Sequence, residues 1–473
     1  HQSCHRKIME DYSVEIDMQK LSPMMKQYFA VKEKCKGFLL FFRLGDFYEM
    51  FFDDALLASR VLELTLTGRD CGLEERAPMC GIPYHACEIY IKKLIDAGYK
   101  VAICEQLTDP KDAKGGIVER DIVRIVTPGT VTESNMLDES KNNYIAAIYA
   151  LDKRCALCFA DISTGEVHLF DKTSKNLEAE VVNELVRFEP VEILFNEKFL
   201  DYKNVQEFIR TKMNVSVQLL DDEEFDISSK KDIVLKQFNV DDLDEISLHE
   251  GTPEADCVCG LFGYIYNTQK TLVGRFTEIK RYNDNFFMEL DYTARRNLEL
   301  TETMRGKEKK GSLLWVLDHT NTSMGKRLLK SYIEQPLVKL AIITNRLDAV
   351  EQLCRKSVLR QQLSDALSKV YDIERLMTRI MYKTATPRDV KSLSLTALQL
   401  PEIKKILGEF SSKLLTELNS KIDTLEDISG LVERAIVDEP PITAKEGGVI
   451  KDGFNAELDN LRHIISGGKD IID

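Results

Sequence analysis

The segment FLLFFRLGDFYEMFFDDA, residues 38–55, decides how the start of the chain is expected to fold. The apolar run at 38–42 predicts a buried strand, and the Gly-Asp pair at 45–46 predicts a turn. The residues Phe, Tyr and Glu at 47–49 come directly after that turn. The pattern therefore predicts aromatic rings and one carboxylate at a loop tip, where a ring can stack on a nucleic-acid base. The alternative is that these phenylalanines only pack a core.

Length and composition are those of a globular protein with several cores. The chain has 473 residues, enough for about three domains. It is 44% hydrophobic and 30% charged. The net charge of −14 excludes a generally basic nucleic-acid binder, and acidic residues slightly outnumber basic ones even within 21–137. Composition by itself does not indicate DNA.

The eleven cysteines are scattered, and their spacing does not suggest a disulfide framework, so reduced thiols are expected. Cys155 and Cys158 form a lone CxxC, but a strand would point them to opposite faces. Cys80, His85 and Cys87 form a denser cluster at the start of a predicted helix. The sequence contains no run of 18 apolar residues and no hydrophobic signal core at its start, so a cytoplasmic location without membrane contact is expected.

The residue pattern changes twice along the chain. Residues 21–132 alternate helical patterns with short apolar strands, which predicts an α/β unit. The polar stretch 133–143 predicts a boundary. Residues 144–170 alternate like a β-meander, and helix–strand units follow, including one helix predicted at 197–209. From residue 286 apolar residues recur at spacings of three and four, which predicts an all-α region.

Six motifs lie in order along the chain: GDFYE at 45–49, CGIPYHA at 80–86, VAICEQ at 101–106, VRIVTPGT at 123–130, LDYTARRNLEL at 290–300 and GSLLWVLDHTNTSMGKRLL at 311–329. In residues, order and spacing they resemble the MutS family of DNA mismatch repair proteins. The resemblance runs from about residue 21 to the end of the sequence.

The resemblance implies a multidomain fold with an α/β mismatch-binding domain, an RNase H-like α/β connector domain and an all-α lever domain. The expected divisions are a non-family extension at 1–20, the mismatch-binding domain at 21–132, a linker at 133–143, the connector at 144–270, the first part of the lever at 286–450 and the start of a clamp domain at 451–473.

The resemblance also implies a DNA site. Phe47 is expected to act as a wedge that stacks on a mispaired base from the minor groove, and Glu49 to hydrogen-bond that base. Arg69, in the predicted loop after the helix at 53–64, and Tyr84, at the start of the next helix, are expected as lesser DNA contacts. For both, a surface or packing role is the alternative.

The implied function is recognition of mismatched or unpaired bases in duplex DNA by Phe insertion and DNA kinking. One alternative is a metal-dependent nuclease, because RNase H-like nucleases gather carboxylates around two metal ions. Asp161 is a candidate ligand there, with Glu192 as a second at a strand edge. The other alternative is a structural scaffold that does not bind DNA.

Full-length family members are DNA-dependent ATPases that bind ATP and Mg²⁺ through a C-terminal GxxxxGK[ST] loop. The sequence contains no such loop: its nearest candidate, Gly325-Lys326, has Thr320 at the first Gly position and Arg327 at the Ser/Thr position. The chain is therefore expected to be incomplete and to have no enzymatic activity, cofactor or metal of its own. Partners implied by the resemblance are mismatched double-stranded DNA, a second copy in a homodimer and a MutL-type repair protein at the connector, in a nucleoid-associated cytoplasmic setting.

Overall fold

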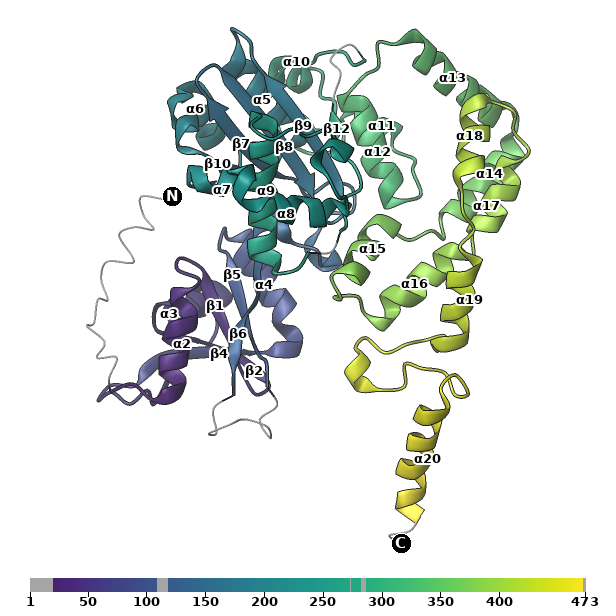
Figure 1. The fold of residues 1–473 in the computed structure, drawn as a ribbon. Coiled ribbons are helices and arrows are strands. Elements are labelled where there is room, and N and C mark those ends of the chain that lie inside the picture. The colour runs from purple at the N-terminus through teal and green to yellow at the C-terminus, as the bar shows by residue number, and fades with distance from the viewer. Residues whose placement is uncertain (1–19, 109–117, 273, 282–285, 471–473) are drawn as a thin grey trace.

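The structure, a computed structural model, describes residues 20–108, 118–272, 274–281 and 286–470. The predicted extension at 1–20 lies almost entirely outside these residues. Figure 1 shows two α/β units, one below the other, and a helical part that runs beside them and ends in α20 (Ala456–Asp470). Among the described residues no helix is long and apolar enough to cross a membrane.

The first unit is built on a six-stranded sheet with the order β3-β4-β2-β1-β5-β6. Its strands are β1 (Leu39–Leu44), β2 (Phe47–Phe51), β3 (Thr67–Arg69), β4 (Ala77–Pro83), β5 (Val101–Gln106) and β6 (Arg120–Val126). Its helices are α2 (Pro23–Glu33), α3 (Phe52–Leu62) and α4 (Cys87–Asp96). Strands β1 and β2 form an antiparallel hairpin, and β1 runs parallel to β5.

The strand–turn–strand predicted at residues 38–51 is therefore present. Gly45 has φ +60°, a conformation that costs a glycine little, and it opens the turn between β1 and β2. Alternate residues of the hairpin enter two cores: Phe41 and Tyr48 lie on one face, and Phe42 and Phe51 lie on the other. Burial on both faces fixes the register, because a slip of one residue would exchange the faces.

The second unit has the strand order β11-β10-β7-β8-β9-β12. Its strands are β7 (Ile145–Leu151), β8 (Arg154–Asp161), β9 (Glu166–Lys172), β10 (Glu192–Phe195), β11 (Ser216–Leu219) and β12 (Lys280–Arg281). Strands β7, β8 and β9 form the predicted antiparallel meander, whereas β10 pairs in parallel with both β7 and β11.

Helices cover both faces of this second sheet. They are α5 (Leu177–Phe188), α6 (Lys203–Lys212), α7 (Asp222–Phe225), α8 (Ile227–Phe238) and α9 (Pro253–Gln269). Helices α5 and α6 pack on one face, and α7, α8 and α9 on the other. The prediction of a single helix at 197–209 is wrong. A 3-10 helix, η5 (Glu197–Asp201), is followed by Tyr202, whose buried ring stacks on Phe199, and α6 begins at Lys203.

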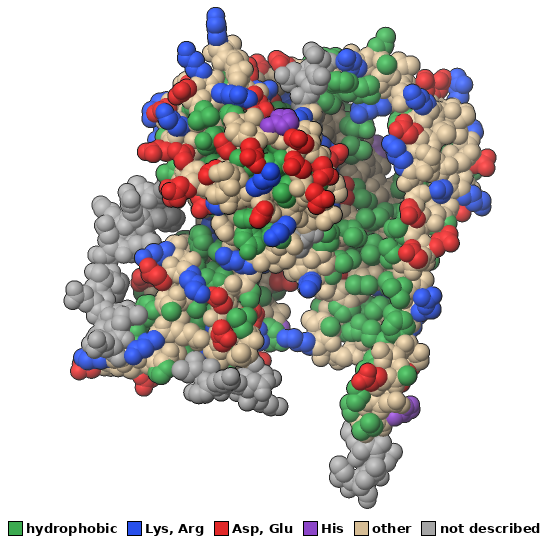
Figure 2. Space-filling view, viewed as in Figure 1, with side chains coloured by type: hydrophobic (Ala, Val, Ile, Leu, Met, Phe, Trp, Pro, Cys, Tyr) green, Lys and Arg blue, Asp and Glu red, His purple; other side chains and the backbone are tan. Residues whose placement is uncertain are grey.

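The described elements beyond residue 291 are helices, with two isolated bridges: α10 (Tyr292–Asn297), α11 (Leu313–Leu317), α12 (Ser323–Glu334), α13 (Leu340–Arg355), α14 (Ser357–Leu367), α15 (Ile373–Met381), α16 (Pro387–Ala397), α17 (Leu400–Leu407), α18 (Lys413–Lys421), α19 (Glu426–Ala435), the 3-10 helix η7 (Ala444–Glu446) and α20. Figure 2 shows hydrophobic side chains gathered over part of this region.

The stretch 133–143 is packed against the helical part. Arg375 of α15 is buried and donates hydrogen bonds to the backbone carbonyls of Asp138 and Lys141. Beside it, the buried Arg327 of α12 forms an ion pair with the partly exposed Asp372, with N–O distances of 2.6 and 2.9 Å. The Arg375 hydrogen bonds tie the predicted linker to helix α15 of the predicted lever.

Candidate nucleic-acid interface

Phe47 is the first residue of β2, where it pairs with Leu44 of β1 and Pro83 of β4. Its side chain is 48% exposed. It is the one exposed phenylalanine among the described residues of the first unit, whereas Phe41 and Phe42 on the neighbouring strand are fully buried. Core packing therefore accounts for the other rings of the segment but not for Phe47.

Glu49 lies on the same side of β2 as Phe47, because side chains two residues apart in a strand share a face. Both belong to the strand and not to a loop tip as predicted, since β2 pairs with β1 and β4 from the first residue after the turn. Tyr48 between them is buried on the opposite face and donates a hydrogen bond to Glu105. Burial raises the pKa of the Tyr48 hydroxyl, and the neighbouring Glu105 carboxylate raises it further.

Arg69 was predicted in a loop and instead ends β3, a short strand that pairs with β4. Strand β4 separates β3 from β2, and the Arg69 guanidinium reaches across it to form an ion pair with the Glu49 carboxylate. The structure thus brings together two of the four predicted site residues. In this state Arg69 neutralises the acid beside the exposed ring.

Tyr84 begins a 3-10 turn, η1 (Tyr84–Ala86), and α4 starts only at Cys87. Its ring contacts two cations. The Arg43 guanidinium carbon is 3.6 Å from the ring centroid, and the Lys445 ammonium is 4.8 Å from it and donates to the hydroxyl at 3.3 Å. Such contacts are worth about 0.5–2 kcal/mol each. Tyr84 therefore holds basic groups near the hairpin and has intramolecular partners of its own.

Sequence reasoning missed Arg43 and Lys445. Arg43 carries a local signal, since it stands two residues before the Gly-Asp turn, and it also contacts Glu105 at 3.4 Å. Lys445 carries none, because it lies 361 residues from Tyr84 in the chain. Figure 2 shows basic and acidic side chains interspersed on the visible face of the first unit, so the site has no strong basic field on that face.

Both carboxylates considered as metal ligands of a nuclease already accept hydrogen bonds from other groups of the protein. Asp161, fully buried at the end of β8, accepts hydrogen bonds from the Asn142 side chain, the Asn143 amide and both the amide and hydroxyl of Ser163. Glu192 is likewise buried and hydrogen-bonded. Within the described residues no group of three or more His, Cys, Asp or Glu side chains is arranged to hold a metal ion. Cys155 and Cys158 point into the cores on opposite faces of the sheet.

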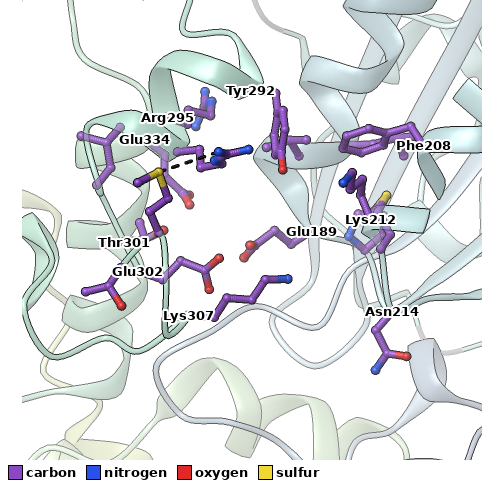
Figure 3. A pocket seen from close by; sticks show the side chains of 18 of the residues that line it. Glu189, Phe208, Lys212, Asn214, Tyr292, Arg295, Thr301, Glu302, Lys307 and Glu334 are labelled. Atoms are coloured by element: carbon purple, nitrogen blue, oxygen red, sulfur yellow. Dashed lines mark hydrogen bonds between the residues drawn. The ribbon is translucent and has the colours of Figure 1, made fainter. Parts of the chain in front are cut away.

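A separate cavity of about 300 Å³ lies where the second unit meets the helical part (Figure 3). Phe208 of α6 and Tyr292 of α10 pack edge to face across this junction, with ring centroids 5.3 Å apart. Of the acids in the wall, Glu189 pairs with Lys330 at 2.7 Å. In Figure 1, α6 and α10 lie at the end of the molecule away from the β1–β2 hairpin, so this cavity is not part of the Phe47 surface.

Comparison with known families gives three consecutive matches. Residues 22–135 match MutS domain I, residues 143–280 match MutS domain II and residues 293–468 match MutS domain III. With the two α/β units and the helical part in the same order, these matches define a multidomain protein of the DNA mismatch repair class.

Curated relatives agree with this class. The chain is 45% identical over 452 residues to the DNA mismatch repair protein MutS of Lachnoclostridium phytofermentans, an alignment that covers 96% of the chain and 48% of the relative. It is 48% identical over 454 residues to the DNA mismatch repair protein MutS of Clostridium tetani, covering 96% of the chain and 50% of the relative. The chain belongs to the MutS family and spans about half the length of these relatives.

Proposed function

We propose that this chain recognises mismatched or unpaired bases in duplex DNA and serves as the sensor of DNA mismatch repair. The observation that carries the proposal is the position of Phe47: an exposed ring at the start of a strand whose neighbouring aromatic residues are buried. The family membership and the names of the relatives, each a DNA mismatch repair protein MutS, support it.

Phe47 acts as a wedge from the minor groove. Inserting a ring between base pairs unstacks a step, which costs a few kcal/mol and costs less where pairing is already faulty. The DNA kinks at the inserted ring. Selectivity then arises from the deformability of the DNA and does not need base-specific contacts to paired sequence.

Glu49 hydrogen-bonds the mispaired base on which Phe47 stacks. In the structure one oxygen of this carboxylate is paired with Arg69. When Arg69 turns to a phosphate, Glu49 is left facing DNA, where its charge is repelled unless a displaced base meets it. Arg69 and Tyr84 are the lesser DNA contacts, and Tyr84 also contacts the cations Arg43 and Lys445 near the hairpin.

The domain roles follow the same proposal. Residues 21–132 form the mismatch-binding domain, 133–143 the linker, 144–270 the connector, 286–450 the first part of an all-α lever, and 451–473 the start of a clamp. An RNase H-like connector is supported by the order β9-β8-β7-β10-β11 with β8 antiparallel to its neighbours. A nuclease is not favoured, because Asp161 and Glu192 are each surrounded by hydrogen-bond donors from the protein.

Partners and cofactors of the complete protein belong to the proposal as well. They are a second copy in a homodimer, a MutL-type protein at the connector, and ATP with Mg²⁺ in the C-terminal ATPase domain of the family, in a cytoplasmic, nucleoid-associated setting. This chain is expected to hydrolyse no ATP, since its sequence has no GxxxxGK[ST] loop.

The test is a gel shift that compares a duplex containing one mismatch with the fully paired duplex of the same sequence. We expect tighter binding to the mismatched duplex. Equal binding to both would favour the structural scaffold, and metal-dependent cleavage of the labelled duplex would favour the nuclease.

A further inference from the structure

Glu192 is the first residue of β10 and has no exposed surface. Its carboxylate accepts four contacts. One oxygen accepts from the Thr127 hydroxyl at 2.5 Å and the Gly129 amide at 3.1 Å. The other accepts from the Tyr264 hydroxyl at 2.7 Å and the Lys100 ammonium at 2.6 Å. Its hydrogen-bonding capacity is thus used within the protein.

Three of these donors belong to the first unit, although Glu192 belongs to the second. Lys100 directly precedes β5, and Thr127 and Gly129 lie in the turn after β6, where Thr127 caps the 3-10 helix η3 (Pro128–Thr130). Tyr264 comes from α9 of the second unit. Glu192 therefore sits at the joint between the two units and is bonded to both sides of it.

Lys100 is held as firmly as its partner. Its side chain is only 12% exposed, and its ammonium also donates to the Gln218 side chain at 2.6 Å and to the Tyr264 hydroxyl at 2.9 Å. Gln218 and Tyr264 belong to the second unit, so the cation of the first unit is enclosed by it. A buried ion pair of this kind adds little net stability, but removing one partner is costly because the other charge is then left buried alone.

Gly129 shows how closely the two units approach. A Cβ atom at this position would lie 2.8 Å from the Ile145 Cβ and 3.0 Å from a carboxylate oxygen of Glu192. The turn at 127–130, part of the VRIVTPGT motif, thus packs against β7 and β10 and leaves no room for a side chain at position 129. Gln269 of α9 adds a hydrogen bond to the Thr130 carbonyl at 3.4 Å.

We propose that Glu192, with Lys100, is a positioning residue that fixes the angle of the first unit on the second. The inference rests on the proposed function in one respect: a rigid joint prevents the first unit from swinging away when Phe47 meets stacked base pairs. The strain of insertion then falls on the DNA, and paired DNA resists it more than mispaired DNA. A loose joint would let the ring withdraw from either duplex and would reduce the difference between them.

The experiment measures the joint without DNA. A spin label is attached through a non-natural amino acid at each of two exposed residues, Lys93 of α4 and Glu207 of α6. Pulsed electron paramagnetic resonance then measures the distance between the two units. We expect Glu192→Gln to broaden the distance distribution, since an amide carries no charge to balance the Lys100 ammonium and its NH2 group cannot accept from the donors that meet the second carboxylate oxygen. Glu184→Gln is the matched control, because it removes an almost buried carboxylate that pairs with Arg187 inside the second unit and should leave the distribution narrow.

The second readout is the ratio of affinities for mismatched and paired duplex, which Glu192→Gln should lower toward one. If Glu192→Gln fails to fold, the double variant Lys100→Met with Glu192→Gln removes both charges and takes its place. The backbone amides of β1 and β7 should exchange their hydrogens as slowly in the variants as in the unsubstituted chain, which would show that each unit remains folded.

An unchanged distance distribution in Glu192→Gln overturns the proposal that Glu192 and Lys100 fix the angle between the units, whatever the DNA result. A broadened distribution with an unchanged ratio overturns its role in selectivity. If the unsubstituted chain itself shows no preference for the mismatched duplex, the proposed function fails while the distance measurement still decides on the joint.

Discussion

Phe47→Ala separates a wedge from a core residue, because the two roles predict opposite balances between stability and binding. Full burial of a Phe side chain is worth about 1.5–3 kcal/mol. With 48% of the side chain exposed, roughly half of that stabilisation is present in the free protein. We therefore expect Phe47→Ala to lower the free energy of unfolding by about 1 kcal/mol. The fully buried Phe41→Ala should cost about 3–5 kcal/mol.

The effect on binding should be larger and confined to mismatched DNA. Stacking of one base on an aromatic ring is worth about 1–3 kcal/mol, which is a factor of about 5 to 150 in affinity. Phe47→Ala should lower the affinity for mismatched duplex by that factor and change the affinity for paired duplex little. Fluorescence anisotropy with matched labelled duplexes measures both affinities, and urea unfolding measures stability.

Ile89→Ala on α4 is the control, since it also removes an exposed apolar side chain, 61% accessible, from the first unit. It should leave both the affinities and their ratio unchanged. The wedge assignment is refuted if Phe47→Ala still discriminates mismatched from paired DNA. A loss of several kcal/mol in unfolding free energy, as large as that of Phe41→Ala, would instead show that Phe47 is needed for the core.

Three further changes test the neighbourhood and the packing of the helical part. Arg69→Ala should weaken binding to paired and mispaired DNA alike and lower the salt slope by about one; an unchanged slope would leave Arg69 only as the partner of Glu49. Glu49→Gln should strengthen binding to paired DNA more than to mispaired DNA and narrow their ratio, and an equal loss for both would make Glu49 a structural acid. Arg327→Ala should lower the unfolding free energy by about 1.5–3 kcal/mol, because it removes two charge-assisted hydrogen bonds to the partly exposed Asp372, whereas the exposed Arg355→Ala should change it by at most about 0.5 kcal/mol. Burial raises the pKa of Asp372, but the hydrogen bonds and charge of Arg327 outweigh burial, and the pKa lies below its usual value. The stability that this pair provides is therefore present above a pH of about 4 and is lost as the pH falls further. In urea unfolding at several pH values, the unfolding free energy of Arg327→Ala should fall less steeply with decreasing pH than that of the unsubstituted chain.

Local pattern predicted the elements that are set by local chemistry. The hairpin at 38–51 follows from an apolar run and a Gly-Asp turn. Helix α2 likewise begins at a local signal, since Ser22 caps it and Pro23 occupies its first turn. The helix predicted at 197–209 was wrong because its pattern cannot show that the ring of Tyr202 stacks on Phe199 between two shorter helices.

The candidate site was predicted only in part, because its geometry depends on strand order. That Phe47 and Glu49 share a face follows from a period of two. The ion pair of Glu49 with Arg69 requires β4 to stand between β2 and β3, which the 20 residues separating the two side chains do not reveal. Glu192 is less predictable still. Its charge at a strand edge suggested a metal ligand, whereas the role proposed for it at the joint depends on donors 63 to 92 residues away that the fold brings together.

The charges around Phe47 fit a sensor whose selectivity comes from the ring. Arg69 is paired with Glu49, and Arg43 and Lys445 lie over the ring of Tyr84, so each of these cations already has a partner within the protein. Affinity gained by neutralising phosphates is independent of sequence and would raise binding to paired and mispaired DNA by the same factor. A strongly basic surface would thus add binding to paired DNA, the species in large excess, without improving the ratio between the two. Under the proposed function, an exposed ring on a short strand, a carboxylate whose charge is paired with Arg69, and the proposed joint between the units act instead on the one property in which a mismatch differs, the lower cost of opening its stack.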